Sequence, residues 1–260
     1  YVQKDKSTRK DTQLGGGGFW ACAGARIWLK PNAICMPVGG NSLTDLPGQL
    51  AGQLEKLDVQ DEISMWIWRE ERTGGSILQS EIKYDGHERS FRYLNPRDPL
   101  TLSCIPSTSQ IHSARYLHFC CPPSNLSSSL EHLLTYPGRS LVVYEPIPSA
   151  CSPDHYSALR DVLPNVDIFS PNHEELELFF DISERIPHED FYQRIESYCE
   201  TRYHDLGAKT IIVRAGSHES FISNRNEAFG KIGSEWLPPY RTPTKRLRWS
   251  RIQLALGIVF

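Results

Sequence analysis

The sequence predicts a three-layer α/β domain built on a mostly parallel sheet, with a small antiparallel β lid. From residue 116 onward, short segments rich in β-branched and apolar residues alternate with segments of helical character. This alternation is typical of parallel strands joined by right-handed crossovers. Residues 63–94 instead read as strands separated by turns, without helices between them, and predict the lid. A length of 260 residues is enough for one large domain.

A glycine turn is expected at residues 15–18. Residues 15–29, GGGGFWACAGARIWL, continue from this turn into small and apolar residues, which predicts a helix buried on most sides. A short buried strand is expected at 33–39, in the sequence AICMPVG. Leucines at 46, 50, 54 and 57 share one helical face, so an amphipathic helix is expected at 46–57.

The lid and the alternating region follow. Within 63–94, the stretches ISMWIW, SILQSEIKY and SFRYL predict three strands separated by RTGG and by an Asp-Gly turn. Further strands are expected at 116–121, 141–146, 166–171 and 210–216. Helices are expected near 126–134, near 155–163, from 173 and near 189–203.

Composition excludes several classes of protein. Hydrophobic residues make up 39% and charged residues 23% of the chain, which excludes disordered, coiled-coil and membrane-bundle proteins. A net charge of −3, without a basic block before the last twenty residues, argues against a nucleic-acid partner. Seven cysteines without a C-x-x-C pair, together with the lack of a signal peptide or membrane helix, predict a cytoplasmic protein with no membrane contact. These residues leave the oligomeric state open.

The segment SPNHEEL at 170–176 directly follows an expected strand. It therefore lies at the carboxyl end of a parallel strand, where open α/β sheets bind ligands. Asn172 and Glu175 have the spacing of a helix capping box, which is the structural interpretation. The functional interpretation is that the two side chains order water around a phosphate-bound Mg²⁺, an ion that keeps several of its waters.

Other candidate site residues end strands or form turns. The glycine run at 15–18 lets a ligand approach the backbone closely, although a flexible turn explains it equally well. Gly216 and Glu145 each follow or end an expected strand at the same edge of the sheet. Gly216 is otherwise a turn residue, and Glu145 is otherwise a solvated charge.

The order of these features resembles the PfkB or ribokinase-like carbohydrate kinases. The resemblance rests on a glycine-rich start, a β flap, the acidic strand end VVYEPIP, the N-x-x-E segment SPNHEEL and the strand TIIVRAG. Within this family, the chain more closely resembles the fungal maintenance-of-killer branch. That resemblance rests on the segments GGGGFWACAGARIWL, FRYL, LHFCCPP, YEPIPSAC, SPNHEEL and EWLPPY. The resemblance covers nearly all of residues 14–240.

The resemblance implies ATP-dependent phosphoryl transfer to the hydroxymethyl group of a sugar or nucleoside, with Mg²⁺ and with the flap as lid. By residue, it implies that the acceptor contacts Gly16, Gly17 and Gly18. It also implies that Asn172 and Glu175 organise Mg²⁺ and that Gly216 lies near the nucleotide. This sequence departs from the family pattern by Phe19 and Trp20 in place of an asparagine, by Glu145 in place of an aspartate and by Glu219 in place of a glycine.

The largest departure is at the C-terminus, where the family has a G-A-G-D type motif that stabilises the transferred phosphoryl group and supplies a base. Residues 241–260 form a basic tail without this motif, so we expect the fold to be truncated there and the chain as written to be inactive. In a shifted reading frame, the codons of residues 251–259 permit D-x-T-G-A-G-[ND]-S-[FL], which predicts a frameshift between 240 and 251.

Two functional hypotheses remain besides a truncated kinase. A non-catalytic kinase-like protein that binds a metabolite or a protein is favoured by the same departures from the family pattern. A metal protein is the least favoured, because the candidate ligands adjoin or alternate on an expected strand and lack ordinary zinc spacing; these ligands are His112, His118, Cys120 and Cys121.

Overall fold

The computed structural model describes most of the chain between residues 12 and 238. The described residues are 12, 14–39, 43–58, 64–69, 77–85, 88–95, 101–105, 110–133, 135, 138, 140–181, 190–216, 218–230 and 232–238. The basic tail at 241–260, with the proposed frameshift, lies outside the described residues.

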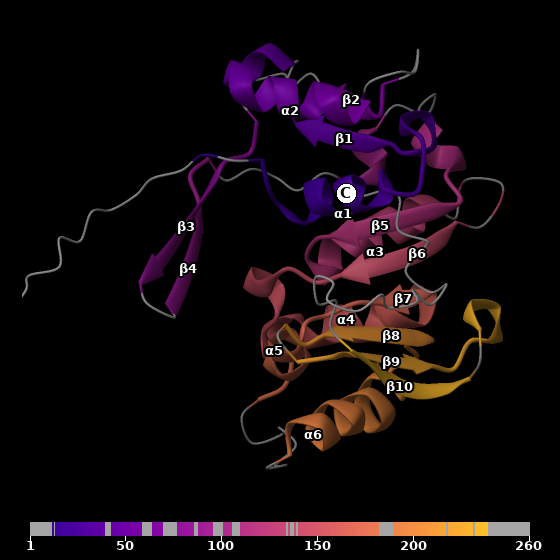
Figure 1. The fold of residues 1–260 in the computed structure, drawn as a ribbon. Helices are drawn as coiled ribbons and strands as arrows, with labels where there is room; N and C mark the ends of the chain where they lie inside the picture. Colours follow the sequence, from indigo (N-terminus) through magenta and orange to yellow (C-terminus); the bar gives the residue numbers. More distant parts are fainter. Residues whose placement is uncertain are drawn as a thin grey trace, which may run out of the picture.

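A six-stranded, mostly parallel sheet forms the centre of the fold (Figure 1). The strand order is β10-β9-β8-β7-β6-β5. Strands β5 to β8 pair in parallel, β9 pairs antiparallel with β8, and β10 pairs antiparallel with β9. Its strands are β5 (Tyr116–Cys120), β6 (Leu141–Glu145), β7 (Ile168–Phe169), β8 (Thr210–Arg214), β9 (Ser220–Asn224) and β10 (Gly233–Leu237). The predicted α/β fold with a mostly parallel sheet is confirmed.

Helices alternate with strands along the chain, as the sequence predicts. They are α1 (Gly17–Ala25), α2 (Gly48–Asp58), α3 (Pro123–Leu133), α4 (Tyr156–Val162), α5 (His173–Leu178) and α6 (Phe191–Tyr198). Short 3₁₀ turns lie at Pro31–Ala33, Leu43–Asp45, Leu102–Cys104, Gln110–Ser113, Pro148–Ala150, Pro153–His155, Leu163–Asn165 and Glu227–Phe229. Among the described residues, no helix is both long and apolar enough to cross a bilayer.

The two faces of β5 pack into different cores, because successive side chains of a strand point to opposite sides. Phe119 packs with Leu126 of α3 and Leu159 of α4 in the larger core. Cys120 packs against the smaller core, which contains Cys22 and Ala25 of α1. Helix α1 and the α3–α4 pair therefore cover opposite faces of the sheet, and this arrangement gives the predicted three layers.

The lid prediction is correct for only part of its range. Strands β3 (Ser80–Asp85) and β4 (Glu88–Tyr93) form an antiparallel hairpin, which projects away from the sheet in Figure 1. The first expected lid strand, β2 (Trp66–Arg69), instead pairs in parallel with β1 (Met36–Gly39). Expecting three antiparallel strands over 63–94 was wrong at β2, because Trp66 is buried in the smaller core rather than exposed on a flap.

Helix α6 ends in a π-helical turn, Cys199–Tyr203. The His204 amide donates to the Cys199 carbonyl at 3.0 Å, five residues back. The extra residue of this turn leaves the fully buried Tyr203 in contact with α5, where its hydroxyl donates to the Leu176 carbonyl at 2.6 Å. The carbonyls in the last turn of a helix have no partner within the helix, so Tyr203 satisfies one that α5 leaves open.

Candidate functional site

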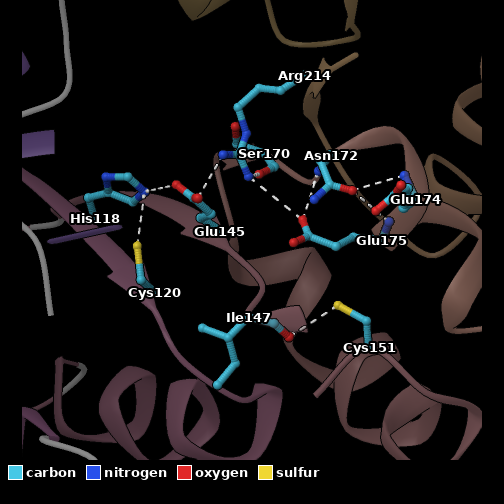
Figure 2. A network of polar contacts seen from close by, with 10 residues as sticks. All are labelled: His118, Cys120, Glu145, Ile147, Cys151, Ser170, Asn172, Glu174, Glu175 and Arg214. Atoms are coloured by element: carbon cyan, nitrogen blue, oxygen red, sulfur yellow. Dashed lines mark hydrogen bonds and ion pairs between the residues drawn. The ribbon is translucent and has the colours of Figure 1, made fainter. Parts of the chain in front are cut away.

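The candidate site lies at the carboxyl ends of the four parallel strands (Figure 2). Strand β5 ends at Cys120, β6 ends at Glu145 and β8 ends at Arg214. Strand β7 continues through Ser170 to Asn172, which forms an isolated parallel bridge with Arg214. Parallel strands end at one edge of a sheet, and ligands bind there in open α/β folds.

Asn172 and Glu175 form a complete capping box at the start of α5. The Asn172 side-chain oxygen accepts from the amides of Glu174 at 2.9 Å and Glu175 at 2.8 Å. In return, Glu175 Oε2 accepts from the Asn172 amide at 2.8 Å. The structural interpretation of SPNHEEL is therefore confirmed, and any ligand role of these residues must be compatible with it.

Arg214 links the two carboxylates of the site. Its Nη1 lies 2.8 Å from Glu145 Oε1, and its Nη2 lies 3.7 Å from Glu175 Oε2. Arg214 Nη2 also donates to the Ser170 carbonyl at 3.1 Å, which fixes the guanidinium over the strand end. One cation therefore compensates two acids, Glu145 at the end of β6 and Glu175 in the first turn of α5.

Glu145 also faces a histidine and a cysteine from the neighbouring strand. His118 Nε2 lies 3.3 Å from Glu145 Oε2 and 3.7 Å from Cys120 Sγ. His118 is 4% exposed, whereas Cys120 and Glu145 are partly exposed. The three side chains belong to one face of β5 and β6 (Figure 2).

The two carboxyl groups have pKa values shifted in opposite directions. Burial raises the pKa of Glu145, but the His118 hydrogen bond and the charge of Arg214 outweigh burial and hold it below its ordinary value. Burial dominates at Glu175, whose pKa is raised despite its hydrogen bond from Asn172 and the charge of Arg214. Glu145 is thus the more acidic of the two carboxyl groups. Burial and the Glu145 charge raise the pKa of the Cys120 thiol, which is protonated in the absence of a cation.

Helix α1 begins directly beside these strand ends. A Cβ added at Gly17 would lie 3.1 Å from Cys120 Sγ and 3.9 Å from Glu145 Oε1, so the close approach suits glycine. Gly16 precedes the helix with φ of 90°, a conformation that glycine adopts without strain. Gly18 lies in the first turn of α1. The predicted acceptor glycines therefore reach the same edge as Glu145.

The structure brings most of the predicted site residues to one edge of the sheet, and it adds two that sequence reasoning missed. Gly216 follows β8 with φ of 62° and nothing within 4 Å of an added Cβ. The missed residues are Arg214 and, as a partner of Glu145, His118. Arg214 stands beside Gly216 in TIIVRAG, and its charge at a strand end was the available signal.

The four residues of the metal-protein hypothesis do not form one cluster. His112 Nε2 donates to the Ile105 carbonyl at 3.3 Å, and the His112 ring meets the His132 ring edge to face. Cys121 is buried in the larger core. Only His118 and Cys120 of that set lie together, and Glu145 is the third member of their group.

Sequence comparisons give one relative and no family assignment. No family model matches the chain. An uncharacterized protein of Schizosaccharomyces pombe is 30% identical over 163 residues, which amount to 61% of this chain. The matched region is 44% of that relative, so the chain spans less than half the length of the curated relative it matches.

Structural comparisons give a consistent group of similar folds. Ribokinase from Thermotoga maritima has a TM-score of 0.56 at 15% identity, over 93% of this chain and 73% of that one. A protein of E. coli assigned as ribokinase II, in complex with ATP and Mg²⁺, has a TM-score of 0.54 at 15% identity, over 93% and 75%. Adenosine kinase from Anopheles gambiae, in complex with P1,P4-di(adenosine-5) tetraphosphate, has a TM-score of 0.57 at 13% identity, over 88% and 67%.

The chain has the ribokinase-like fold. At these low identities the likeness establishes the arrangement of strands and helices, and the chemistry must be judged from this chain's own residues. For Mg²⁺, the donor set of the ribokinase-like sheet edge fits. Glu175 supplies an oxygen atom of the kind that Mg²⁺ prefers, because it commits only Oε2 to the capping box, whereas the Asn172 side-chain oxygen already accepts from two amides. Arg214 shares this space, and a bound cation would compete with its guanidinium.

Proposed function

We propose that this chain is a carbohydrate-kinase-related protein of the PfkB family that binds ATP with Mg²⁺ and a small sugar or nucleoside. The observation that carries the proposal is the convergence of four sequence elements at one edge of a ribokinase-like sheet. These are the glycine turn before α1, Glu145, the Asn172–Glu175 pair and Gly216. The ribokinase and adenosine kinase structures with this fold support a phosphorylated alcohol as the class of product.

Three of these four elements have a proposed role in binding the substrates. Gly16, Gly17 and Gly18 present the start of α1 to the hydroxymethyl acceptor, because backbone without side chains allows close approach and a helix N-terminus favours polar groups. Asn172 and Glu175 orient the waters of Mg²⁺. Gly216 leaves room for the nucleotide after β8. Bound Mg²⁺ would neutralise phosphate charge during transfer.

We further propose that the 260-residue chain does not itself transfer phosphate, since its sequence contains no G-A-G-D type turn. Losing a single donor of this kind costs about 10² to 10³ in rate. The alternative function, a non-catalytic metabolite- or protein-binding protein, is favoured by Arg214. Its guanidinium already compensates Glu145 and Glu175, which makes a second cation less necessary for stability.

A thermal-shift titration of the intact chain with ATP and Mg²⁺ tests nucleotide binding. We expect a rise in Tm that needs both components, since a ligand at 100 times its Kd stabilises by about 2.7 kcal/mol. Glu175→Gln keeps an acceptor for the Asn172 amide but removes the charge, and it should abolish the Mg²⁺-dependent part. No shift in the wild type, or an unchanged shift in Glu175→Gln, would contradict the proposal.

Asp190→Ala is a control variant that loses the N-cap of α6, a helix that takes no part in the proposed binding of Mg²⁺. The Asp190 carboxylate accepts from the Gln193 amide at 2.9 Å at the start of α6, outside the candidate site. This variant should melt earlier while keeping the full nucleotide-induced shift. Product analysis with a panel of polyols, sugars and nucleosides then separates the two functions. Binding without product supports the non-catalytic protein, and product formation supports the kinase.

Two finer assignments belong to this proposal. We place the protein in the fungal maintenance-of-killer branch, supported by its motifs and by its fungal relative. We also place it in the cytoplasm, supported by the free thiols of Cys22, Cys120, Cys121, Cys151 and Cys199. Residues 241–260 are proposed to be read out of frame. Sequencing the transcript across the codons of 236–260 should yield D-x-T-G-A-G in the shifted frame, and its absence there would refute the frameshift.

A further inference from the structure

Three side chains of types that bind transition metals face one another where α1 meets β5 and β6. His118 and Cys120 are two residues apart on β5 and point to the same face, and the strand register places Glu145 directly beside Cys120. One ligand atom from each lies within 4.8 Å of the other two. We propose that His118 Nε2, Cys120 Sγ and Glu145 Oε2 bind a zinc ion. This site shares Glu145 with the proposed kinase site but does not require that the chain bind ATP or a sugar.

The distances fit a shared ion better than direct hydrogen bonds. Ordinary zinc bond lengths at tetrahedral angles separate sulfur from nitrogen by about 3.6 Å and nitrogen from a carboxylate oxygen by about 3.4 Å. The observed separations are 3.7 Å from Cys120 Sγ to His118 Nε2 and 3.3 Å from His118 Nε2 to Glu145 Oε2. A direct N–H···O hydrogen bond is typically about 2.9 Å long. An ion between these three atoms therefore requires little movement.

The imidazole of His118 is oriented for this role. His118 is 4% exposed, and its Nδ1 has no hydrogen-bond partner among the described residues. Nε2 is the nitrogen that faces the thiol and the carboxylate. Without an ion, Nε2–H donates to Glu145. In the other neutral tautomer the proton is on Nδ1, and the lone pair of Nε2 points to the place where the ion would sit; neutral imidazole is the form that binds metals.

The surroundings also match a metal site. Carboxylates that bind a metal are usually hydrogen-bonded as well. Here Glu145 Oε1 accepts from Arg214 Nη1 at 2.8 Å while Oε2 faces His118. A thiolate and a carboxylate balance the two positive charges of the ion. Because Cys120 and Glu145 are partly exposed, the ion has an entry path and water has access to a fourth position.

The donor set separates this site from the proposed Mg²⁺ pair. A thiolate and an imidazole favour zinc over Mg²⁺, which prefers oxygen donors. Sequence spacing did not reveal the site, because the third ligand comes from the neighbouring strand and is placed by register. Gly17 adjoins it, so an ion bound here would lie under the first turn of α1.

Titration of the intact, reduced chain with Co²⁺ tests the site spectroscopically. We expect a thiolate-to-Co²⁺ charge-transfer band in the near ultraviolet and the visible bands of tetrahedral Co²⁺. Zinc should displace Co²⁺, whereas a large excess of Mg²⁺ should not. Cys120→Ala should abolish the charge-transfer band, and Glu145→Gln or His118→Gln should weaken Co²⁺ binding by about tenfold or more. Cys121→Ala is the matched control, because this adjoining thiol lies outside the group, and it should keep the band.

Protection of the thiol gives a second measurement that needs no variant. Zinc should slow the alkylation of Cys120 in the wild type, measured by mass spectrometry of the peptide that contains it. The proposal is overturned if the wild type shows no charge-transfer band, if Cys120→Ala keeps the band, or if zinc leaves the alkylation rate of Cys120 unchanged. A circular-dichroism melt establishes that each variant is folded before its spectrum is compared.

Discussion

Replacing Asn172 by alanine should destabilise the protein without removing any apolar contact. The Asn172 side-chain oxygen is the acceptor for two amides in the first turn of α5, and Glu175 returns a bond to the Asn172 amide. Helix α5 has only six residues, far too few to be stable alone, so its geometry depends on such contacts. Loss of an N-cap side chain costs about 0.5–2 kcal/mol.

We expect the upper half of that range, about 1–2 kcal/mol, because two backbone amides lose their shared acceptor. For a chain of this size, the corresponding fall in Tm is about 2–8 °C. Urea unfolding followed by tryptophan fluorescence measures the free energy of unfolding directly. Asn172→Ser, which keeps a capping oxygen, should recover at least half of the loss. If Asn172→Ala unfolds at the wild-type midpoint with an unchanged m-value, the capping argument is refuted.

Helix α1, Glu145 and the buried His204 provide three further tests. Gly24→Ala should raise the free energy of unfolding by about 0.5–1 kcal/mol. Gly17→Ala should raise it less, because the added Cβ would lie 3.1 Å from Cys120 Sγ. Equal increases for the two variants in urea unfolding would contradict the close approach of Gly17 to Cys120. The pKa of Glu145 is lowered in the folded protein, so the wild type should have a larger free energy of unfolding than Glu145→Gln at neutral pH. This difference should shrink as the pH falls through the folded pKa of Glu145, and a difference that stays constant with pH would contradict the argument. Burial lowers the pKa of His204 from 6.5, so the folded state favours the neutral ring and the free energy of unfolding should fall as the pH drops below 6.5. In His204→Gln, unfolding at a series of pH values should show a weaker fall over the same range.

The strands that the sequence predicts are those buried on both faces. Strands β5, β6 and β8 read as continuous apolar runs, because helices cover both sides of a parallel sheet. Strands β9 and β10 were missed because each combines only two apolar residues with small or polar ones, and because their pairing is antiparallel. Strand β2 was recognised as a strand but assigned the wrong partner, since apolar pattern alone does not identify the neighbour of a strand.

The site was predictable where it depends on local spacing. Asn172 and Glu175 are three residues apart, and their capping box follows from that spacing. The contacts of Glu145 with Arg214 and His118 depend on strand order and register, which bring together residues distant in sequence. No motif in the chain encodes those contacts, so only the assembled sheet reveals them.

The π-helical turn after α6 makes the protein sensitive to the deletion of a single residue within 199–203. Successive residues of a helix are rotated by about 100°, so deleting one residue from the turn at 199–203 would restore ordinary helical geometry but swing Tyr203 away from Leu176. The lost hydroxyl contact lies at one end of α5, and Glu175 lies one residue before Leu176. A one-residue deletion remote from the sheet edge would therefore loosen the helix that presents this carboxylate.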